Sequence, residues 1–279
     1  MRLNNSLQGS ILLARHNLTE LRNLELDVNN FTTIPNSLSS CSELEVLKIN
    51  LNHLDGPFPT AICQLKFLQH LDISENNIGG ILPACFSPPH MRYAKLSKNR
   101  LQGPLPHAFF NWTRLQILDL SHNQLTGPIP KWFDNLSILR ILLLNKNHFE
   151  GEILSQFCNL SELSLIDLSN NSLSGSIPPC LGNITFTPLL GNLGLPRSGV
   201  VLRAQDIMVE ELIESVTKSI TLVYRGNTIS AIDLSCNNFA GHIPPKIGKL
   251  FHLKSLNLSH NSLSGTISIT FANLTAQRT

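Results

Sequence analysis

The chain has 279 residues, of which 42% are hydrophobic and 14% are charged, and its formal net charge at pH 7 is +2. This near-neutral balance argues against a concentrated basic face, so we expect no nucleic-acid partner. The longest aliphatic run, residues 141–144, is far shorter than the roughly 20 apolar residues that a membrane-spanning helix needs.

One pattern recurs from the first residues to the last: Leu-x-x-Leu-x-Leu-x-x-Asn-x-Leu-x-Gly-x-Ile-Pro, as in residues 115–130. After a partial copy at residues 5–11, copies begin at residues 21, 44, 68, 91, 115, 139, 163, 229 and 253. With one exception the starts are 23 or 24 residues apart, which predicts a solenoid whose turns bury their core against one another. We expect an α/β-type repeat solenoid, a curved right-handed superhelix with a parallel sheet on its concave face.

Within each copy, the Leu-x-Leu portion alternates apolar and polar residues, which predicts a short strand with one buried side. The Asn that follows recurs from Asn29 to Asn261. Because a buried amide is costly unless its hydrogen bonds are made, we expect a ladder of Asn side chains that bonds the backbone of adjacent turns. The recurring Gly and Pro after it suit tight bends.

The exception is the gap of 66 residues between the starts at 163 and 229, which equals one 24-residue copy plus 42 extra residues. We therefore expect repeats over 1–186 (a partial first repeat plus seven), an insertion over 187–228, and two final repeats over 229–279 without a cap. Inside the insertion, residues 203–217 are spaced for a short amphipathic helix or an irregular lid, and residues 220–224 alternate like a strand.

The repeat resembles the plant extracellular leucine-rich repeats, over about four fifths of the chain. Residues 216–227 and 232–235 resemble the end of the island domain of plant receptor-like proteins, which helps to form the ligand site in that family. The resemblance implies an extracellular peptide or microbial ligand, a partner receptor-like kinase or co-receptor, no cofactor, and a location at the plasma membrane or outside the cell. The chain shows no signal peptide, cysteine-containing N-terminal cap or transmembrane helix, so we expect a truncated ectodomain segment.

Four of the six cysteines form two pairs, Cys63 with Cys85 and Cys158 with Cys180, each 22 residues apart. Equivalent positions on stacked turns are about 5 Å apart, which suits a disulfide. We predict both bridges; the alternative is that these residues are buried small hydrophobes. No Cys or His pair has the spacing of metal ligands, so we expect no metal site.

Ten Asn-x-Ser/Thr sequons occur, and such sites carry glycans only in the secretory pathway. Four of them stand four residues before the first Leu of a copy, which places them on the convex face: Asn17, Asn111, Asn135 and Asn159. We predict glycans at these four. Asn257 falls within a predicted strand, where a glycan would obstruct the concave face, so we expect it to be bare.

Most outward positions of the predicted sheet are polar, including a column of aspartates that we read as solvated structure. Three consecutive strands depart from this and mix an aromatic ring, exposed aliphatic side chains and cations, a composition typical of contact surfaces. The candidate ligand-binding residues there are Tyr93, Lys95, Lys98, Ile117, His122, Ile141, Leu143 and Lys146. Such a surface suits an extended peptide with an acidic group; the alternative is a neutral surface.

By resemblance, the island offers further ligand or co-receptor contacts at Lys218, Tyr224 and Arg225, unless it packs only on itself. We find no motif of an enzyme: no phosphate-binding loop, no nucleophile elbow and no isolated carboxylate pair. The leading interpretation is a receptor-like ectodomain segment that acts in defence or development through a partner kinase. The alternatives are a secreted inhibitor of the polygalacturonase-inhibiting kind and a non-functional truncated product.

Overall fold

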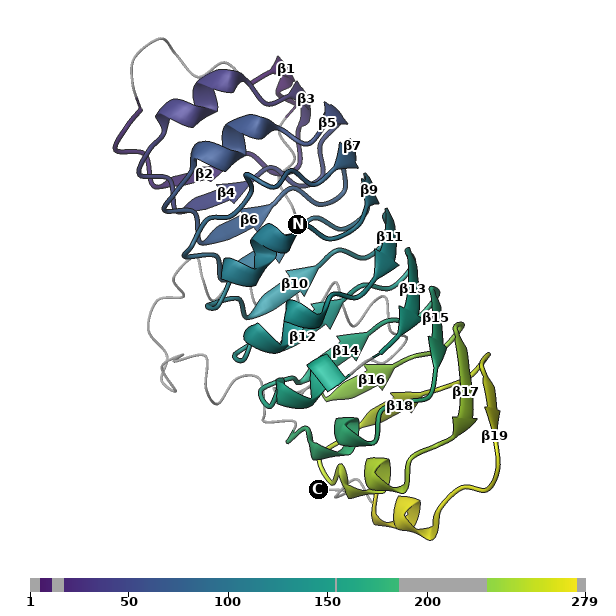
Figure 1. The fold of residues 1–279 in the computed structure, drawn as a ribbon. Helices are drawn as coiled ribbons and strands as arrows, with labels where there is room; N and C mark the ends of the chain where they lie inside the picture. Colours follow the sequence, from purple (N-terminus) through teal and green to yellow (C-terminus); the bar gives the residue numbers. More distant parts are fainter. Residues whose placement is uncertain (1–5, 12–17, 154, 186–229, 275–279) are drawn as a thin grey trace.

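The computed structural model describes residues 6–11, 18–153, 155–185 and 230–274. These residues form one curved stack of parallel turns, in which a turn contributes a short strand, a second strand on a neighbouring face and, in most turns, a 3-10 helix (Figure 1). The expected curved solenoid is therefore confirmed. Most of the segments that return the chain to the inner strands contain a 3-10 helix of five residues rather than a longer α-helix, and the segment between β7 (Asn77–Ile81) and β8 (Tyr93–Lys95), which is described throughout, contains neither.

Nine of the strands form a parallel sheet, which we call the inner sheet, and they follow one another in chain order. Its strands are β2 (Asn23–Glu25), β4 (Val46–Lys48), β6 (His70–Asp72), β8 (Tyr93–Lys95), β10 (Ile117–Asp119), β12 (Ile141–Leu143), β14 (Leu165–Asp167), β16 (Ala231–Asp233) and β18 (Ser255–Asn257). Equivalent residues pair in register, so Leu118 lies between Ala94 and Leu142. All three middle residues are completely buried, as the period-two pattern predicts.

The Asn ladder is present as expected, and Asn76 shows its geometry. The Asn76 amide nitrogen donates to the carbonyl oxygens of Ile49, Ile73 and Ser74 at 2.9–3.1 Å, and its Oδ1 accepts from the backbone N–H of Leu54 at 2.9 Å. One side chain thus joins its own turn to the preceding turn. This satisfies a buried amide that would otherwise cost on the order of 1–3 kcal/mol.

A second parallel sheet, here called the lateral sheet, runs along the edge of the stack where the sequence analysis expected only bends (Figure 1). Its strands are β5 (Asp55–Pro57), β7 (Asn77–Ile81), β9 (Arg100–Gly103), β11 (Gln124–Pro128), β13 (His148–Glu152), β15 (Ser172–Gly175), β17 (Asn238–His242) and β19 (Ser262–Ser264). At the first turns, β1 (Gln8–Ser10) pairs with β3 (Asn30–Thr33). Glycine and proline obscure a strand signal, but identical turns stacked in register still align their backbone donors and acceptors.

The outer side of the stack, opposite the inner sheet, carries 3-10 helices, most of which begin directly after a proline. They are η1 (Asn36–Ser40), η2 (Thr60–Gln64), η3 (His107–Asn111), η4 (Lys131–Asn135), η5 (Ser155–Asn159), η6 (Pro179–Asn183), η7 (Pro245–Lys249) and η8 (Ile269–Asn273). Buried aromatic rings pack between successive turns on this side, including Phe86 on Phe109 and Phe133 on Phe157, each pair with centroids 6.0 Å apart. These rings fill the wider outer side of each turn.

Both predicted disulfides are formed between neighbouring turns. The Cα atoms of Cys63 and Cys85 are 5.4 Å apart, and those of Cys158 and Cys180 are 5.2 Å apart. Cys41 is a buried free thiol, and Cys236 is a half-buried one. Burial raises the pKa of the Cys41 thiol.

The predicted insertion, residues 187–228, lies outside the described residues, together with its candidate contacts Lys218, Tyr224 and Arg225. The flanking repeats are nevertheless direct neighbours, because β14 pairs with β16 and Leu165 stands opposite Ala231. The inner sheet therefore continues in register across the insertion. Within the described ranges, no helix is long and apolar enough to cross a bilayer.

Candidate functional site

The candidate site lies on the inner sheet, where side chains from successive strands form columns because the strands pair in register. The last residue of each strand gives a central column: Glu25, Lys48, Asp72, Lys95, Asp119, Leu143, Asp167, Asp233 and Asn257. Over the first five strands the charges alternate in sign. Opposite charges on adjacent strands attract, and like charges repel.

Two ion pairs hold the alternating part of the central column together. The Lys48 ammonium lies 3.6 Å from the Glu25 carboxylate, and the Lys95 ammonium lies 3.4 Å from Asp72. The Lys95 side chain is 18% exposed and that of Asp72 is 9% exposed, so water screens this pair less than it would a surface pair. Lys95, predicted to contact a ligand, is thus already engaged within the sheet.

Three of the four aspartates of the central column are buried rather than solvated, which corrects the sequence-based interpretation, and Asp233 is half-buried. Taken as whole residues, Asp72, Asp119 and Asp167 are at most 6% exposed. Each accepts two hydrogen bonds at one carboxylate oxygen, from the backbone N–H and the hydroxyl of the serine two residues later, at 2.6–3.0 Å. Asp233 makes the same pair of bonds with Ser235. The recurring Asp-x-Ser spacing was the available signal, because serine can satisfy an aspartate that the strand geometry buries.

Burial changes the acidity of two of these carboxyls. Desolvation raises the pKa of Asp119, although hydrogen bonds from Ser121 and Ser97 and the charge of Lys95 act in the opposite direction. Desolvation also raises the pKa of Asp167 to about 6, and the charges of Asp233 and Asp119 add to this effect. Asp167 lies between Leu143 and Asp233 in the sheet.

The first residue of each strand gives a second column, in which His70 and Tyr93 are neighbours. Their rings meet edge to face with centroids 4.6 Å apart, and Tyr93 is half-buried. His70 is only 1% exposed, and among the described residues neither ring nitrogen has a hydrogen-bond partner. Burial lowers the pKa of His70 to about 4, with smaller contributions from the charges of Arg92 and Lys48. His70 is therefore neutral at physiological pH.

Three predicted contact residues are not the exposed aliphatic side chains that the sequence analysis expected. Ile117, Ile141 and Leu143 are 3%, 0% and 5% exposed. In-register pairing places Ile141 between Ile117 and Leu165, so the side chains of one column shield each other. Period-two alternation identifies which face a residue occupies, but not how closely its neighbours in adjacent turns cover it.

The remaining predicted cations form a ridge at the end of the inner strands, where each turn places a non-glycine residue in the left-handed region. Lys98, His122 and Lys146 occupy it in successive turns with φ of 53–54°. Both lysines are exposed, and Lys98 lies 3.1 Å from Glu75 in an ion pair. Burial, followed by the charges of Lys146 and Lys98, lowers the pKa of the half-buried His122.

Of the predicted glycosylation sites, Asn111, Asn135 and Asn159 each form the last residue of a 3-10 helix, on the outer side of the stack. Asn17 lies outside the described residues. The Asn257 amide, expected to be bare, donates to the Asp233 carboxylate at 3.0 Å within the inner sheet. In the described ranges, no group of three or more His, Cys, Asp or Glu side chains is arranged so that it could hold a metal ion.

Comparisons with known proteins agree with this architecture. The leucine-rich repeat family models match residues 19–78, 89–149, 162–184, 228–250 and 252–274, which together make up most of the chain. A comparison with curated protein sequences finds no match.

Several solved structures share the fold. The ectodomain of the Arabidopsis thaliana receptor kinase GASSHO1/SCHENGEN3, in complex with CASPARIAN STRIP INTEGRITY FACTOR 2, is 32% identical with a TM-score of 0.78; the match covers 96% of this chain and 28% of that one. The Arabidopsis HAESA ectodomain with an IDA peptide hormone is 27% identical, with a TM-score of 0.68 and coverages of 97% and 44%. A plant ice-binding protein is 26% identical, with a TM-score of 0.67 and coverages of 94% and 73%. The chain thus spans less than half of either receptor ectodomain.

Proposed function

We propose, from the premise that this chain belongs to the leucine-rich repeat family, that it is a receptor-like ectodomain segment that recognises an extracellular peptide or microbial pattern. Its likeness to ligand-bound plant receptor ectodomains supports a role in binding rather than catalysis. The four aspartates of the inner sheet support the same proposal, because each is bound to a serine within the fold.

The observation that carries the proposal is the grouping of Tyr93, Lys98, His122 and Lys146 along three consecutive turns. Tyr93 offers a half-buried ring, and the exposed lysines flank His122 on the ridge. Because Lys98 is paired with Glu75, Lys146 is the cation better placed to meet an acidic group of the ligand. Aromatic and cationic side chains are both frequent at binding surfaces, and here Tyr93 lies at the start of β8 while the lysines lie beyond the ends of β8 and β12.

Signalling through a partner kinase is the second part of the proposal. HAESA, a structural neighbour, is known in complex with its peptide hormone and the co-receptor SERK1. The two disulfides suit an oxidising compartment, which supports a location outside the cell or at the plasma membrane. Defence and development are both compatible with this role.

The proposal can be tested with a synthetic library of extended peptides that carry one glutamate at a fixed position. We expect selected peptides to bind the full chain about tenfold more weakly after the double change Lys98→Glu and Lys146→Glu. The double change Lys131→Glu and Lys249→Glu, on η4 and η7, is the matched control, because it makes the same change of charge on the outer side. Failure to select any peptide, or an equal loss in the control, would contradict a binding site on this face.

A further inference from the structure

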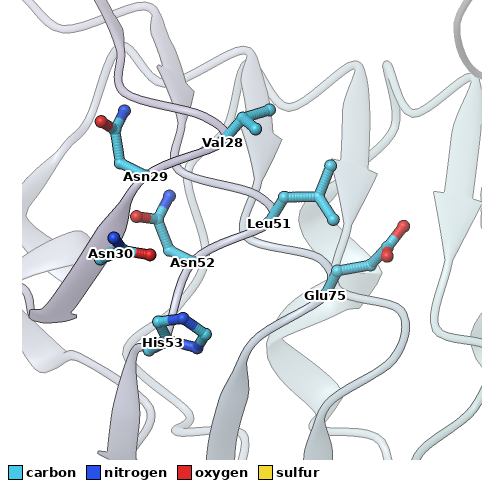
Figure 2. Close-up of a pocket in the computed structure, with 7 residues that line it drawn as sticks. All are labelled: Val28, Asn29, Asn30, Leu51, Asn52, His53 and Glu75. Atoms are coloured by element: carbon cyan, nitrogen blue, oxygen red, sulfur yellow. The ribbon is translucent and has the colours of Figure 1, made fainter. Parts of the chain in front are cut away.

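A pocket of about 390 Å³ opens between the first turns of the stack, beside the ridge rather than on the inner sheet (Figure 2). It is lined by Val28, Asn29, Asn30, Leu51, Asn52, His53 and Glu75. Its volume lies in the range of small-ligand pockets. None of the candidate peptide contacts lines it, so the pocket calls for a separate explanation.

Two of the lining amides belong to the Asn ladder and are already engaged in hydrogen bonds with the backbone. The Asn29 amide nitrogen donates to the carbonyls of Leu26 and Asp27, and its Oδ1 accepts from Leu7. Asn52 likewise donates to three carbonyls and accepts from one backbone N–H. The polar lining groups outside the ladder are Asn30, His53 and Glu75, and of these Glu75 is ion-paired with Lys98 through its Oε1 at 3.1 Å.

One wall of the pocket is apolar because the first two turns differ from the later ones at the ridge position. Val28 and Leu51 occupy it with φ of 57° and 54°, whereas the next four turns have Glu, Lys, His and Lys there. A positive φ is unfavourable for a β-branched side chain, so Val28 is a conspicuous choice at this place. Figure 2 shows Val28 and Leu51 side by side on the same wall, with Glu75 beyond them.

Asn30 supplies the chemistry of the site. It begins the sequon Asn30-Phe31-Thr32, and its side chain is exposed at the start of β3. The side-chain amides of two sequon asparagines on the convex face donate hydrogen bonds within the fold. Asn111 donates to the Ser87 hydroxyl, and Asn135 donates to the Phe110 carbonyl. Among the described residues, no hydrogen bond engages the Asn30 side chain in this way.

We propose that Asn30 carries an N-linked glycan whose first N-acetylglucosamine lies in this pocket. The co-reactant is an oligosaccharide linked to a polyisoprenyl diphosphate. The Asn30 amide nitrogen forms a bond to C1 of the first sugar while the C1–O bond to the diphosphate breaks. The diphosphate leaves with the bonding electron pair, and the amide proton passes to a base of the transferase.

The lining residues match the surface of this sugar. The C–H face and acetyl methyl group of N-acetylglucosamine can pack on Val28 and Leu51. Its hydroxyls can donate to Oε2 of the Glu75 carboxylate, because Oε1 is paired with Lys98 and the side chain is still 39% exposed. His53 stands next to the attachment point, because its backbone N–H donates to the Phe31 carbonyl at 2.9 Å. The pocket is thus built from the attachment residue and from the next two turns.

The experiment is glycopeptide mass spectrometry of the full chain, secreted from cultured mammalian cells behind an added signal peptide. We expect Asn30 to be occupied in wild type and in Thr32→Ser, which keeps the sequon, and bare in Thr32→Ala. A bare Asn30 in secreted protein would overturn the proposal. Glycans at Asn111, Asn135 or Asn159 report passage through the pathway, so this result is separate from the failure of the peptide-binding proposal.

A second measurement tests the pocket itself by native digestion with peptide-N-glycosidase. We expect release from Asn30 to be several-fold slower than release from Asn111, and Leu51→Ser to remove the difference while leaving occupancy unchanged. We also expect enzymatic removal of the Asn30 glycan to lower the melting temperature by about 2–4 °C. Equal release rates at both sites in wild type would show that the glycan does not lie in the pocket.

Discussion

The central column of the inner sheet has two halves that share one motif but differ in what lies beside it. In the first half, Asp72 lies between Lys48 and Lys95, and a 3.4 Å ion pair balances its charge. In the second half, Asp167 lies between Leu143 and Asp233. Both aspartates accept the same bonds from a serine two residues later. The repeat therefore sets the local bonding, while the adjacent turns set the electrostatics.

The test with the largest expected effect is the contribution of Asp167 to the pH dependence of the free energy of unfolding. Its folded-state pKa of about 6 exceeds the ordinary value of 3.8, so the folded chain binds this proton more tightly than the unfolded chain. The resulting stability is complete below about pH 4 and is lost as the pH rises through 6, by about 2–3 kcal/mol.

Urea unfolding of wild type and Asp167→Asn between pH 4 and pH 7 measures this contribution. We expect the variant to gain stability relative to wild type as the pH rises over that range. Asp55→Asn, on an exposed residue of β5, is the control and should show no such trend. A constant difference between Asp167→Asn and wild type would mean that the two halves do not differ electrostatically.

The second test removes the balanced carboxylate of the first half. Asp72→Ala leaves Lys48 and Lys95 without the charge between them and leaves Ser74 without its acceptor. We expect the free energy of unfolding to fall by about 2 kcal/mol at pH 7, less than for a fully buried pair because Lys95 is partly exposed. Urea unfolding of Asp55→Ala provides the reference. If the free energy of unfolding falls no further in Asp72→Ala than in Asp55→Ala, the balanced charge of the first half does not stabilise the fold.

The test with the smallest expected effect gives the second half of the column a charge pattern like that of the first half. Leu143→Lys places a cation between Asp119 and Asp167, as Lys95 stands between Asp72 and Asp119. We expect the pKa of Asp167 to fall by about one unit. NMR titration of the carboxyl groups measures this change. Leu143→Met keeps the volume without the charge and should leave this pKa in place. An unchanged pKa in Leu143→Lys would show that the lysine turns away from the column.

Several features of the fold could be predicted from spacing alone because each turn repeats the same contacts. The ladder role of Asn76 and the pairing of Cys63 with Cys85 follow from residues that occupy equivalent positions on adjacent turns. A 23- or 24-residue period makes these neighbours in space wherever the turns stack.

Other features depended on neighbours that the period does not specify. Ile141 is outward on its strand, yet it is completely buried because Ile117 and Leu165 flank it. The lateral sheet formed from segments rich in glycine and proline, where strand propensity is low. The Asn30 pocket required Val28, Leu51 and Glu75 to come from three different turns.

By itself, the sequence determined the solenoid, the face of each residue and the residues that lock one turn to the next, since all of these follow from periodicity. Only the tertiary structure decided how exposed each outward side chain is, which charges balance each other and where a pocket opens. The physical reason is that burial and electrostatic interaction depend on distances of a few ångströms between side chains of different turns. Those distances depend on which residues happen to stand next to each other in the stack.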